Sequence, residues 1–496
     1  MSIKSVFAKI YAQIEKLNID RWASKPVETQ QKVFIKLLKD AQNTSFGINH
    51  QFAKIKTYED FKKQVPIRDY EDLRPYIDRV VAGEKDILWK GIPLYFAKTS
   101  GTTSGTKYIP ISNESMPYHI QAAKQALLMY IAETGKADFV NGKMIFLQGS
   151  PILEVKNGIK TGRLSGIAAH FVPSYLQRNR MPSWETNCIE DWETKVNAIV
   201  EETINEDMSV ISGIPPWVQM YFEKLTEKSG KSIGKLFKNF NLFVYGGVNF
   251  EPYRQKFENL IGRKVDSIEL FPASEGFFAF QDSQKEKGML LLLNSGMFYE
   301  FIPSDEFFNE NPNRISIADV KLGVNYVLIL NTNAGLWGYN IGDTVMFTSL
   351  KPYRVIVSGR IKHYISAFGE HVIAKEVEYA LKDAVENSEI SVNEFTVAPQ
   401  VNPKEGLPYH EWFIEFENEP KDMIAFVKKL HQKMQEQNVY YFDLTEGKVL
   451  QPLKVRKVVK SGFQKYMKSI GKLGGQNKVP RLSNDRKIAD QLEIID

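Results

Sequence analysis

The densest cluster of potentially reactive groups in the sequence is the stretch KTSGTTSGTKYIPIS, which runs from Lys98 to Ser112. It holds seven Ser or Thr hydroxyls and two glycines, and Lys107 follows the second glycine by two positions. Glycines let backbone N–H groups approach an anion closely, hydroxyls donate hydrogen bonds, and a lysine adds a point charge. Together these residue types favour a loop that surrounds a phosphate.

A flexible polar linker is the competing interpretation, because runs of Ser, Thr and Gly are often unstructured. The stretch also departs from the Gly-x4-Gly-Lys-Ser/Thr motif, since only three residues separate Gly101 from Gly105 and Tyr108 replaces the magnesium-binding hydroxyl. It leads directly, however, into the apolar YIPIS and the capping-type SNES, ahead of a helical pattern over 114–133. We therefore expect a loop that is fixed to a sheet.

Two further motifs place a carboxylate beside a glycine. In ELFPASEG, Glu275 ends an apolar strand, and Mg²⁺ usually takes one or two such carboxylates while phosphate and water complete its shell. In WGYNIGDTVMF, Asp343 follows Gly342, and an ionised carboxylate accepts the two hydrogen bonds that ribose hydroxyls donate. Taken singly, a solvated strand-end Glu and a Gly-Asp turn remain open alternatives.

A fourth motif, GKLGGQNKVPRL, carries Lys478 in a glycine-rich stretch shortly before Pro480. A lysine on a mobile loop can bring positive charge to a phosphate at one stage of a reaction and withdraw it later. Most lysines are solvated surface groups, so this motif indicates a phosphate-binding lysine only in combination with the three other motifs.

The segments between these motifs predict an α/β fold. Short apolar runs alternate with amphipathic segments between about residues 114 and 360, and the strand ends of such folds hold ligands. Helices are expected over 191–204 and 252–261. The expected strands are MIFLQGS from Met144, NLFVYGG from Asn241, SIELFPASEG from Ser267, VNYVLILNT from Val324 and YRVIVSG from Tyr353.

The patterns at the two ends of the chain predict N-terminal helices and a separate C-terminal domain. Near the N-terminus, helically spaced apolar residues predict helices packed on something larger: Phe7, Ile10, Ile14, Leu17, Val33, Phe34, Leu37 and Leu38. Beyond about residue 360, a shorter series of helices and strands is enough for a separate α+β domain of roughly 130 residues. We expect a large domain over 1–360 and a small one over 361–496.

Composition sets limits on the class of protein. The chain has 496 residues, 43% hydrophobic and 25% charged, which is ordinary for a globular protein with more than one core. Its net charge of +5 gives no bulk argument for nucleic acid, and KVRKVVK from Lys454 fits one basic face of the small domain. A single cysteine, Cys188, and no 18-residue apolar run predict a cytoplasmic protein without membrane spans. The seven histidines show no metal-ligand spacing.

In this order and at these separations, the motifs resemble those of the GH3 family of acyl-acid amido synthetases, a branch of the adenylate-forming enzymes. TSGTTSGTK, FPASEG and YNIGD correspond to the family's phosphate loop, Tyr-Ala-Ser-Ser-Glu-type motif and Tyr-Arg-x-Gly-Asp-type motif. The resemblance extends over essentially the whole chain. It implies a large domain of mixed sheets covered by helices and a small mobile domain after a hinge at SGRIKHYIS. The sequence departs at Phe271 and Pro272, where Tyr and Ala are common, and at Asn340, where Arg is common.

The resemblance also implies roles in a site for ATP and Mg²⁺. Lys107 would hold the β and γ phosphates, Glu275 would bind Mg²⁺, and Lys478 would stabilise charge at the α-phosphate. The other residues implied to bind the nucleotide are Thr99, Ser100, Gly101, Thr102, Thr103, Gly246, Gly247, Phe271, Ala273, Ser274, Tyr339, Asp343 and Arg360.

The implied reaction joins a carboxylic acid to an amine, expected to be an amino acid, through acyl-AMP. Two rivals remain: an acyl-CoA synthetase that shares the first step, and a nucleotide-binding protein without turnover. The sequence identifies neither the acid nor the amine. Five aromatic residues are candidates either for an acyl pocket or for the core: Phe171, Trp217, Tyr221, Phe277 and Phe278.

Overall fold

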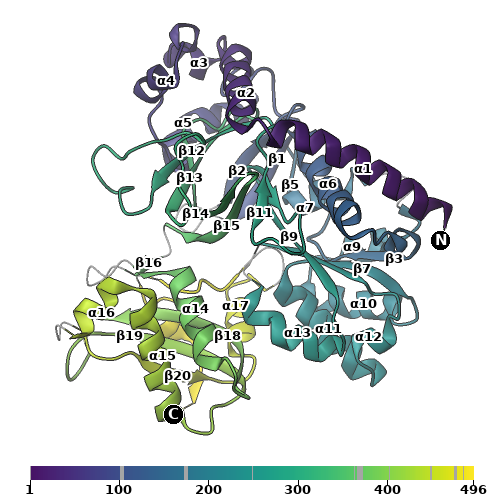
Figure 1. Cartoon of the computed structure of the whole chain (residues 1–496), viewed down its shortest axis with the longest axis vertical. Coiled ribbons are helices and arrows are strands. Elements are labelled where there is room, and N and C mark those ends of the chain that lie inside the picture. The colour runs from purple at the N-terminus through teal and green to yellow at the C-terminus, as the bar shows by residue number, and fades with distance from the viewer. Residues whose placement is uncertain are drawn as a thin grey trace. The chain divides into compact units, whose positions relative to one another are not determined.

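The computed structural model (Figure 1) describes residues 2–100, 106–172, 177–247, 250–361, 364–365, 372–401, 403–446, 450–473, 478–483 and 485–495. The chain forms two compact units. The larger comprises 1–248, 260–341 and 345–357, and the smaller comprises 249–259, 342–344 and 358–496.

Five helices begin the larger unit: α1 Ile3–Ala23, α2 Pro26–Ala41, α3 Ser45–Asn49, α4 Tyr58–Gln64 and α5 Tyr70–Val81. The predicted burial of the α2 stripe is confirmed, since Phe34, Leu37 and Leu38 lie in the core with Val33 packed against it. A proline in the first turn begins α2, where the missing N–H is not needed.

The N-terminal helix is present, but the expectation that its large apolar residues pack inward is wrong. Phe7, Ile10, Ile14 and Leu17 are all more than half exposed. The buried face of α1 holds Ser5, Ala12, Glu15 and Ile19 instead. It packs on α6 (Met116–Thr134), where Gln125 donates a 2.6 Å hydrogen bond to Glu15 and the small Ala122 and Ala126 are buried. Small side chains and specific hydrogen bonds therefore decide which face is covered.

The core of the larger unit is an eleven-stranded sheet in the order β12-β13-β14-β15-β11-β10-β9-β8-β7-β3-β6. Strands β9, β8, β7, β3 and β6 are parallel to one another, and the pairs β9–β10, β10–β11, β11–β15 and β12–β13 are antiparallel. The mixed α/β architecture expected from the sequence is confirmed. The strands span β3 Lys143–Phe146, β6 Arg180–Met181, β7 Met208–Ser212, β8 Leu242–Gly246, β9 Asp266–Ala273, β10 Gly276–Phe280, β11 Met289–Leu291, β12 Met297–Pro303, β13 Asn325–Thr332, β14 Tyr339–Leu350 and β15 Tyr353–Arg360.

Helices cover both faces of the parallel part of this sheet. In Figure 1, α6 lies on one side of β7 and β9, and α10 and α11 lie on the other. Strand residues Val210, Leu242, Val244 and Ile268 share a core cluster with α1 and α6. The other helices here are α7 Leu164–Ala169, α9 Trp184–Asn187, α10 Trp192–Thr203, α11 Pro215–Ser229 and α12 Ile233–Leu236. Most of α13 Arg254–Ile261 belongs to the smaller unit.

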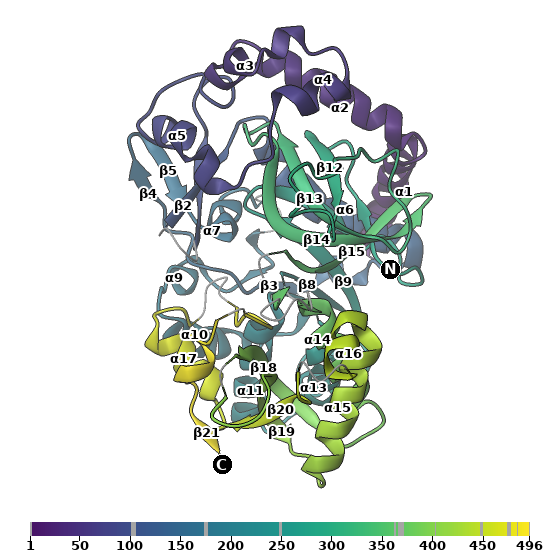
Figure 2. The same cartoon turned by 90° about the vertical axis from the view of Figure 1, so that its left-hand side faces the viewer.

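A second sheet of the larger unit has the order β2-β1-β5-β4. Its strands β2, β4 and β5 are labelled in Figure 2. Its strands are β1 Tyr95–Ser100, β2 Thr106–Ile111, β4 Glu154–Lys156 and β5 Ile159–Gly162. The strand β1 runs antiparallel to β2 and parallel to β5.

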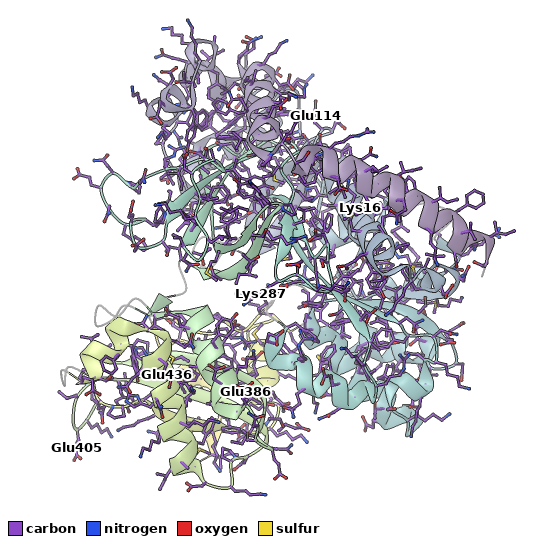
Figure 3. The ribbon with its side chains drawn as sticks, viewed as in Figure 1. Lys16, Glu114, Lys287, Glu386, Glu405 and Glu436 are labelled. Atoms are coloured by element: carbon purple, nitrogen blue, oxygen red, sulfur yellow. The ribbon has the colours of Figure 1, made fainter. Side chains whose placement is uncertain are left out.

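The smaller unit is built on a four-stranded sheet in the order β18-β19-β20-β21. Its elements are β16 Tyr364–Ile365, β17 Val372–Ile373, α14 Ala374–Val385, β18 Ser391–Gln400, β19 Tyr409–Asn418, α15 Met423–Gln437, α16 Val439–Glu446, β20 Lys454–Val458, α17 Gly462–Ser469 and β21 Ile494–Ile495. Short 3-10 helices occur at Phe52–Lys54, Asp138–Asn141, Glu251–Tyr253 and Ala489–Gln491. Glu386, Glu405 and Glu436 lie at the surface of this unit (Figure 3). Within the described ranges, no helix combines the length and apolarity that crossing a bilayer requires.

Candidate active site

The Ser/Thr/Gly stretch is held by a β-hairpin. Strands β1 and β2 pair in register up to Ser100 opposite Thr106, with Thr99 opposite Lys107. The predicted attachment of the loop to a sheet is confirmed by these flanks. The loop residues Gly101, Thr102 and Thr103 lie outside the described residues, as does the side chain of Ser100.

Lys107 is oriented by a tyrosine that sequence reasoning missed. Its Nζ lies 5.1 Å from the ring centroid of Tyr70, a cation–π distance. The Tyr70 hydroxyl in turn accepts a 2.9 Å hydrogen bond from the backbone N–H of Tyr108, and burial raises the pKa of that hydroxyl. Tyr70 stands at the start of α5, which Asp69 and Asp72 close with a capping box. Lys107 is thus supported at the loop end of the hairpin.

The motif FPASEG forms a tight hairpin between two strands of the large sheet. Strand β9 ends at Ala273, Gly276 opposite it begins β10, and Ser274 and Glu275 make the turn. A Cβ on Gly276 would lie 2.4 Å from the sulfur of Met297, so that a larger residue there would displace the end of the methionine side chain. Glu275 is therefore presented at a position that both strands fix.

Phe271 lies in the core rather than at this turn. Its ring is 7% exposed and packs edge-on against Phe278 at 5.0 Å. Only the backbone of Phe271 is therefore placed to contact a ligand. The neighbouring Pro272 is exposed. Four of the five acyl-pocket candidates are also buried: Trp217, Tyr221, Phe277 and Phe278.

The glycines after β8 are explained by close packing. A Cβ on Gly246 would lie 2.5 Å from the carbonyl oxygen of Leu270, on the neighbouring strand β9. Gly247 has a φ of +82°, which L residues rarely adopt. Strand β8 therefore ends in a turn that only glycines permit, beside the β9–β10 hairpin.

Tyr339 and Asp343 lie on the same strand, β14. The alternative of a Gly-Asp corner turn is wrong, since Gly342 and Asp343 lie inside the strand, where Gly342 has a φ of +85°. The start of β14 is clamped by Arg68, whose N–H donates to Gly338 and whose carbonyl accepts from Asn340, both at 2.8 Å. The ring of Tyr339 is buried in the core, and Asp343 is half-buried.

Arg360 ends β15, and its side chain lies outside the described part of the structure. Lys478 is described and exposed. Soon after Lys478 the chain is tied to β18. The Pro480 carbonyl accepts a 2.7 Å hydrogen bond from the Thr396 hydroxyl, and the Val397 N–H donates to Arg481 at 2.9 Å.

A buried ionic cluster secures this segment, and nothing in the spacing of the sequence predicted it. Arg481 forms ion pairs with Glu394 and, at 3.2 Å, with Glu378, and it donates a 3.0 Å hydrogen bond to the Tyr253 hydroxyl. Burial alone would lower the pKa of Arg481, but Glu394, Tyr253 and Glu378 raise it further than burial lowers it. Lys478 thus lies three positions before a firmly anchored arginine.

The predicted site residues divide between the units. Gly246, Gly247, Phe271, Ala273, Ser274, Glu275, Tyr339 and the β1–β2 hairpin belong to the larger unit, and Asp343, Arg360 and Lys478 belong to the smaller. Among the described residues, no three His, Cys, Asp or Glu side chains gather as a metal cluster. One carboxylate still fits Mg²⁺, which commonly takes most of its ligands from phosphate and water.

Comparison with known proteins gives consistent results. The chain matches the GH3 family N-terminal domain over residues 16–186, the GH3 family central domain over 290–360 and the GH3 family C-terminal domain over 375–487. It is 22% identical to indole-3-acetic acid-amido synthetase GH3.3 of Arabidopsis thaliana, covering 94% of this chain and 90% of that protein. It is 23% identical to jasmonoyl-L-amino acid synthetase JAR4 of Nicotiana attenuata over 64% of this chain and 66% of that one.

The fold has relatives among solved structures. The acyl acid amido synthetase AtGH3.15 in complex with 2,4-DB matches with a TM-score of 0.81 at 16% identity, covering 98% of this chain and 96% of that one. A 2-hydroxyisobutyryl-CoA ligase in the postadenylation state matches with a TM-score of 0.61 at 12% identity, covering 94% and 90%. The same fold therefore serves both amide-forming and thioester-forming ligases.

Proposed function

Because the chain belongs to the GH3 family, we propose that it activates a carboxylic acid with ATP as acyl-AMP and transfers the acyl group to an amine, most simply an amino acid. The observation that carries this proposal is the match of the family's three domains, in order, over most of the chain. Two of the nucleotide motifs lie at strand ends and the third forms the first five residues of β14, an arrangement that supports it.

The chemistry explains why these motifs are needed. A carboxylate is a poor acyl donor because its leaving group would be oxide, and its attack on the α-phosphate of ATP exchanges that leaving group for AMP. Pyrophosphate departs in this step. Two anions must meet, so catalysis depends on positioning and charge neutralisation rather than on a protein nucleophile.

In the larger unit, the roles follow from position. Thr99 and Lys107 face each other at the loop end of the hairpin, where backbone groups and Lys107 would hold the β and γ phosphates. Glu275 in the β9–β10 turn would bind Mg²⁺, which would neutralise phosphate charge when bound. Gly246, Ala273 and Ser274 would line the nucleotide with backbone groups.

In the smaller unit, Asp343 would accept hydrogen bonds from the ribose hydroxyls, with Arg360 nearby in the sequence. Lys478 would stabilise charge on the α-phosphate during adenylation. In the second half-reaction, the amine attacks the carbonyl carbon of acyl-AMP, the amide bond forms, and AMP leaves with the electron pair of the broken C–O bond. Withdrawal of Lys478 between the steps would separate the two stages.

A second candidate is acyl-CoA synthesis, which the structural likeness to a CoA ligase favours. The two functions share adenylation and differ only in the acceptor. Amino acid and coenzyme A, offered separately to the enzyme with its acid and ATP, distinguish them by which one consumes acyl-AMP.

The test of the proposal is carboxylate-dependent ATP–pyrophosphate exchange with Mg²⁺ over a panel of aryl, indolyl and aliphatic acids. Exchange that requires one class of acid is expected, and it names the acyl substrate. ATP binding without exchange for any acid would contradict adenylation and support a nucleotide-binding protein without turnover.

A further inference from the structure

Two cations, Lys195 and Arg163, lie at the loop after β3, Gln148–Ser150, and no carboxylate in the described part of the chain forms an ion pair with either of them. Lys195 of α10 is 2% exposed. Its Nζ donates to two backbone carbonyls, that of Gln148 at 3.0 Å and that of Asn187 at 2.6 Å. Burial lowers the pKa of Lys195 to about 8, with opposing smaller effects from Cys188 and Arg163. A buried cation without an anionic partner is unusual, because desolvation is then uncompensated.

A second cation lies over the same loop. The Cβ position of Gly149 is 3.1 Å from Cδ of Arg163 and 3.4 Å from Oγ of Ser165, and Nη1 of Arg163 is 3.8 Å away. Arg163 itself is exposed, so its guanidinium can be reached from solvent. Within the described ranges, the backbone carbonyl of Arg163 accepts from Ile167, but no hydrogen bond or ion pair engages the guanidinium.

Two hydrogen-bond donors beside Arg163 also lack acceptors. The Oγ of Ser165 and the Nε2 of Gln148 are both shielded from solvent, and neither has a partner among the described atoms. Leaving such a group unsatisfied costs about 1–3 kcal/mol, so native proteins rarely do it without a reason. An arginine fork with two neutral donors matches an acceptor that has two oxygens and a negative charge, namely a carboxylate.

The position of this cluster connects it to the site. Strand β3 is parallel to β7, β8 and β9, so Gln148 follows its strand at the same sheet edge as Gly246 and lies two strand spacings, about 10 Å, from it. Arg163 directly follows β5, where Gly162 pairs with Ala97 of the parallel strand β1. The cluster therefore adjoins the hairpin that carries Thr99 and Lys107.

We propose that Arg163, Ser165 and Gln148 bind the α-carboxylate of the acceptor amino acid. This inference rests on the proposed function, which supplies the reason for a second carboxylate. When the amine attacks, the carboxylate of the acyl acid has already become the anhydride with AMP, and the acceptor brings the remaining one. Lys195 is a positioning residue, because it holds the backbone carbonyls of Gln148 and Asn187 and adds positive potential.

The first test is Arg163→Gln, with Lys160→Gln as a matched control that removes one exposed cation from β5. Loss of a charge-assisted pair should raise the KM for the amino acid at least about ten-fold. The KM for the acid in pyrophosphate exchange should change far less. The preference of the enzyme for an amino acid over the corresponding amino acid amide should shrink in Arg163→Gln and persist in Lys160→Gln.

The second test is Ser165→Ala, which separates binding from a structural role. Removing an unsatisfied buried hydroxyl should leave Tm unchanged or raise it, while the KM for the amino acid rises about five-fold. A lower Tm with an unchanged KM would overturn the proposal.

Other outcomes would also overturn it. If Arg163→Gln raised mainly the KM for the acid, the cluster would bind the acyl carboxylate, and if it raised mainly the KM for ATP, the cluster would bind phosphate. Failure of the proposed function is distinguishable from both, because the wild-type protein would then show no acid-dependent exchange.

Discussion

Each unit holds a shielded cation, and the surroundings of the two cations are opposite in charge balance. In the smaller unit, Arg481 is surrounded by Glu378, Glu394 and the Tyr253 hydroxyl, and these partners raise its pKa despite burial. In the larger unit, Lys195 contacts backbone carbonyls, and burial lowers its pKa to about 8.

The contrast indicates that Arg481 has a structural role and that the charge on Lys195 is available to interact with a ligand. The two carboxylates balance Arg481, so it can anchor the segment that follows Lys478. The charge on Lys195 is left for an anion to balance, near Arg163 and the Ser165 and Gln148 donors that have no acceptor among the described atoms. The Arg481 cluster anchors the segment next to Lys478, which is proposed to act in adenylation. The cations at the loop after β3 form the proposed site for the amino acid of the second half-reaction.

The largest expected effect comes from breaking the balanced cluster. Arg481→Met leaves the largely shielded Glu378 and Glu394 without this cation, which should lower the free energy of unfolding by about 3 kcal/mol. Chemical denaturation followed by a probe in the smaller unit measures it. Lys487→Met is the control, since that lysine pairs with Asp485 at the surface and such pairs contribute little. Equal midpoints for the two variants would show that the cluster does not anchor the segment.

The next effect concerns the lysine that the cluster supports. Lys478→Ala should slow acid-dependent pyrophosphate exchange about a hundred-fold, because charge at the α-phosphate loses its partner. Amide formation from preformed acyl-AMP should fall much less. Lys472→Ala, in the same stretch, is the control variant. Equal losses in both half-reactions would argue against a role confined to adenylation.

The carboxylate in the β9–β10 turn is expected to act through Mg²⁺. Glu275→Gln keeps the size of the side chain and removes its charge, so the Mg²⁺ concentration needed for half-maximal exchange should rise about ten-fold, or ~1.4 kcal/mol. An unchanged magnesium dependence would remove Glu275 from the proposed ligands.

The last effect is the pH dependence of the unbalanced lysine. The folded pKa of about 8 lies below the ordinary 10.5, so the unfolded chain binds this proton more tightly. The charge therefore destabilises the fold below pH 8, and the penalty fades as pH rises toward 10.5. The wild type should gain stability relative to Lys195→Met between pH 8 and pH 10, as measured by urea unfolding at each pH. A difference that stays constant with pH would contradict the lowered pKa.

Local patterns in the sequence predicted much of this structure. The five strands expected in the body, and the helices over 191–204 and 252–261, form close to the expected positions, because apolar periodicity and turn residues act over short distances. The motif residues of the β9–β10 turn and of β14 were predictable for the same reason, since their chemistry lies in neighbouring positions.

What the sequence could not predict depends on distant partners. Tyr70, Arg163 and Arg481 stand alone in the sequence, and only folding places them beside Lys107, Gly149 and the two glutamates. The outward face of α1 was misjudged for a related reason. The large apolar residues of α1 are helically spaced and were expected to face inward. The helix packs on α6 through small residues instead, and Gln125 of α6 donates a hydrogen bond to Glu15.

The most direct test of the account is acid-dependent ATP–pyrophosphate exchange measured side by side in wild type, Lys478→Ala and Arg163→Gln. The account predicts exchange that requires the acid, that is nearly lost in Lys478→Ala, and that remains measurable in Arg163→Gln while its amino acid KM rises. Absence of acid-dependent exchange in the wild type, or equal exchange in wild type and Lys478→Ala, would contradict it.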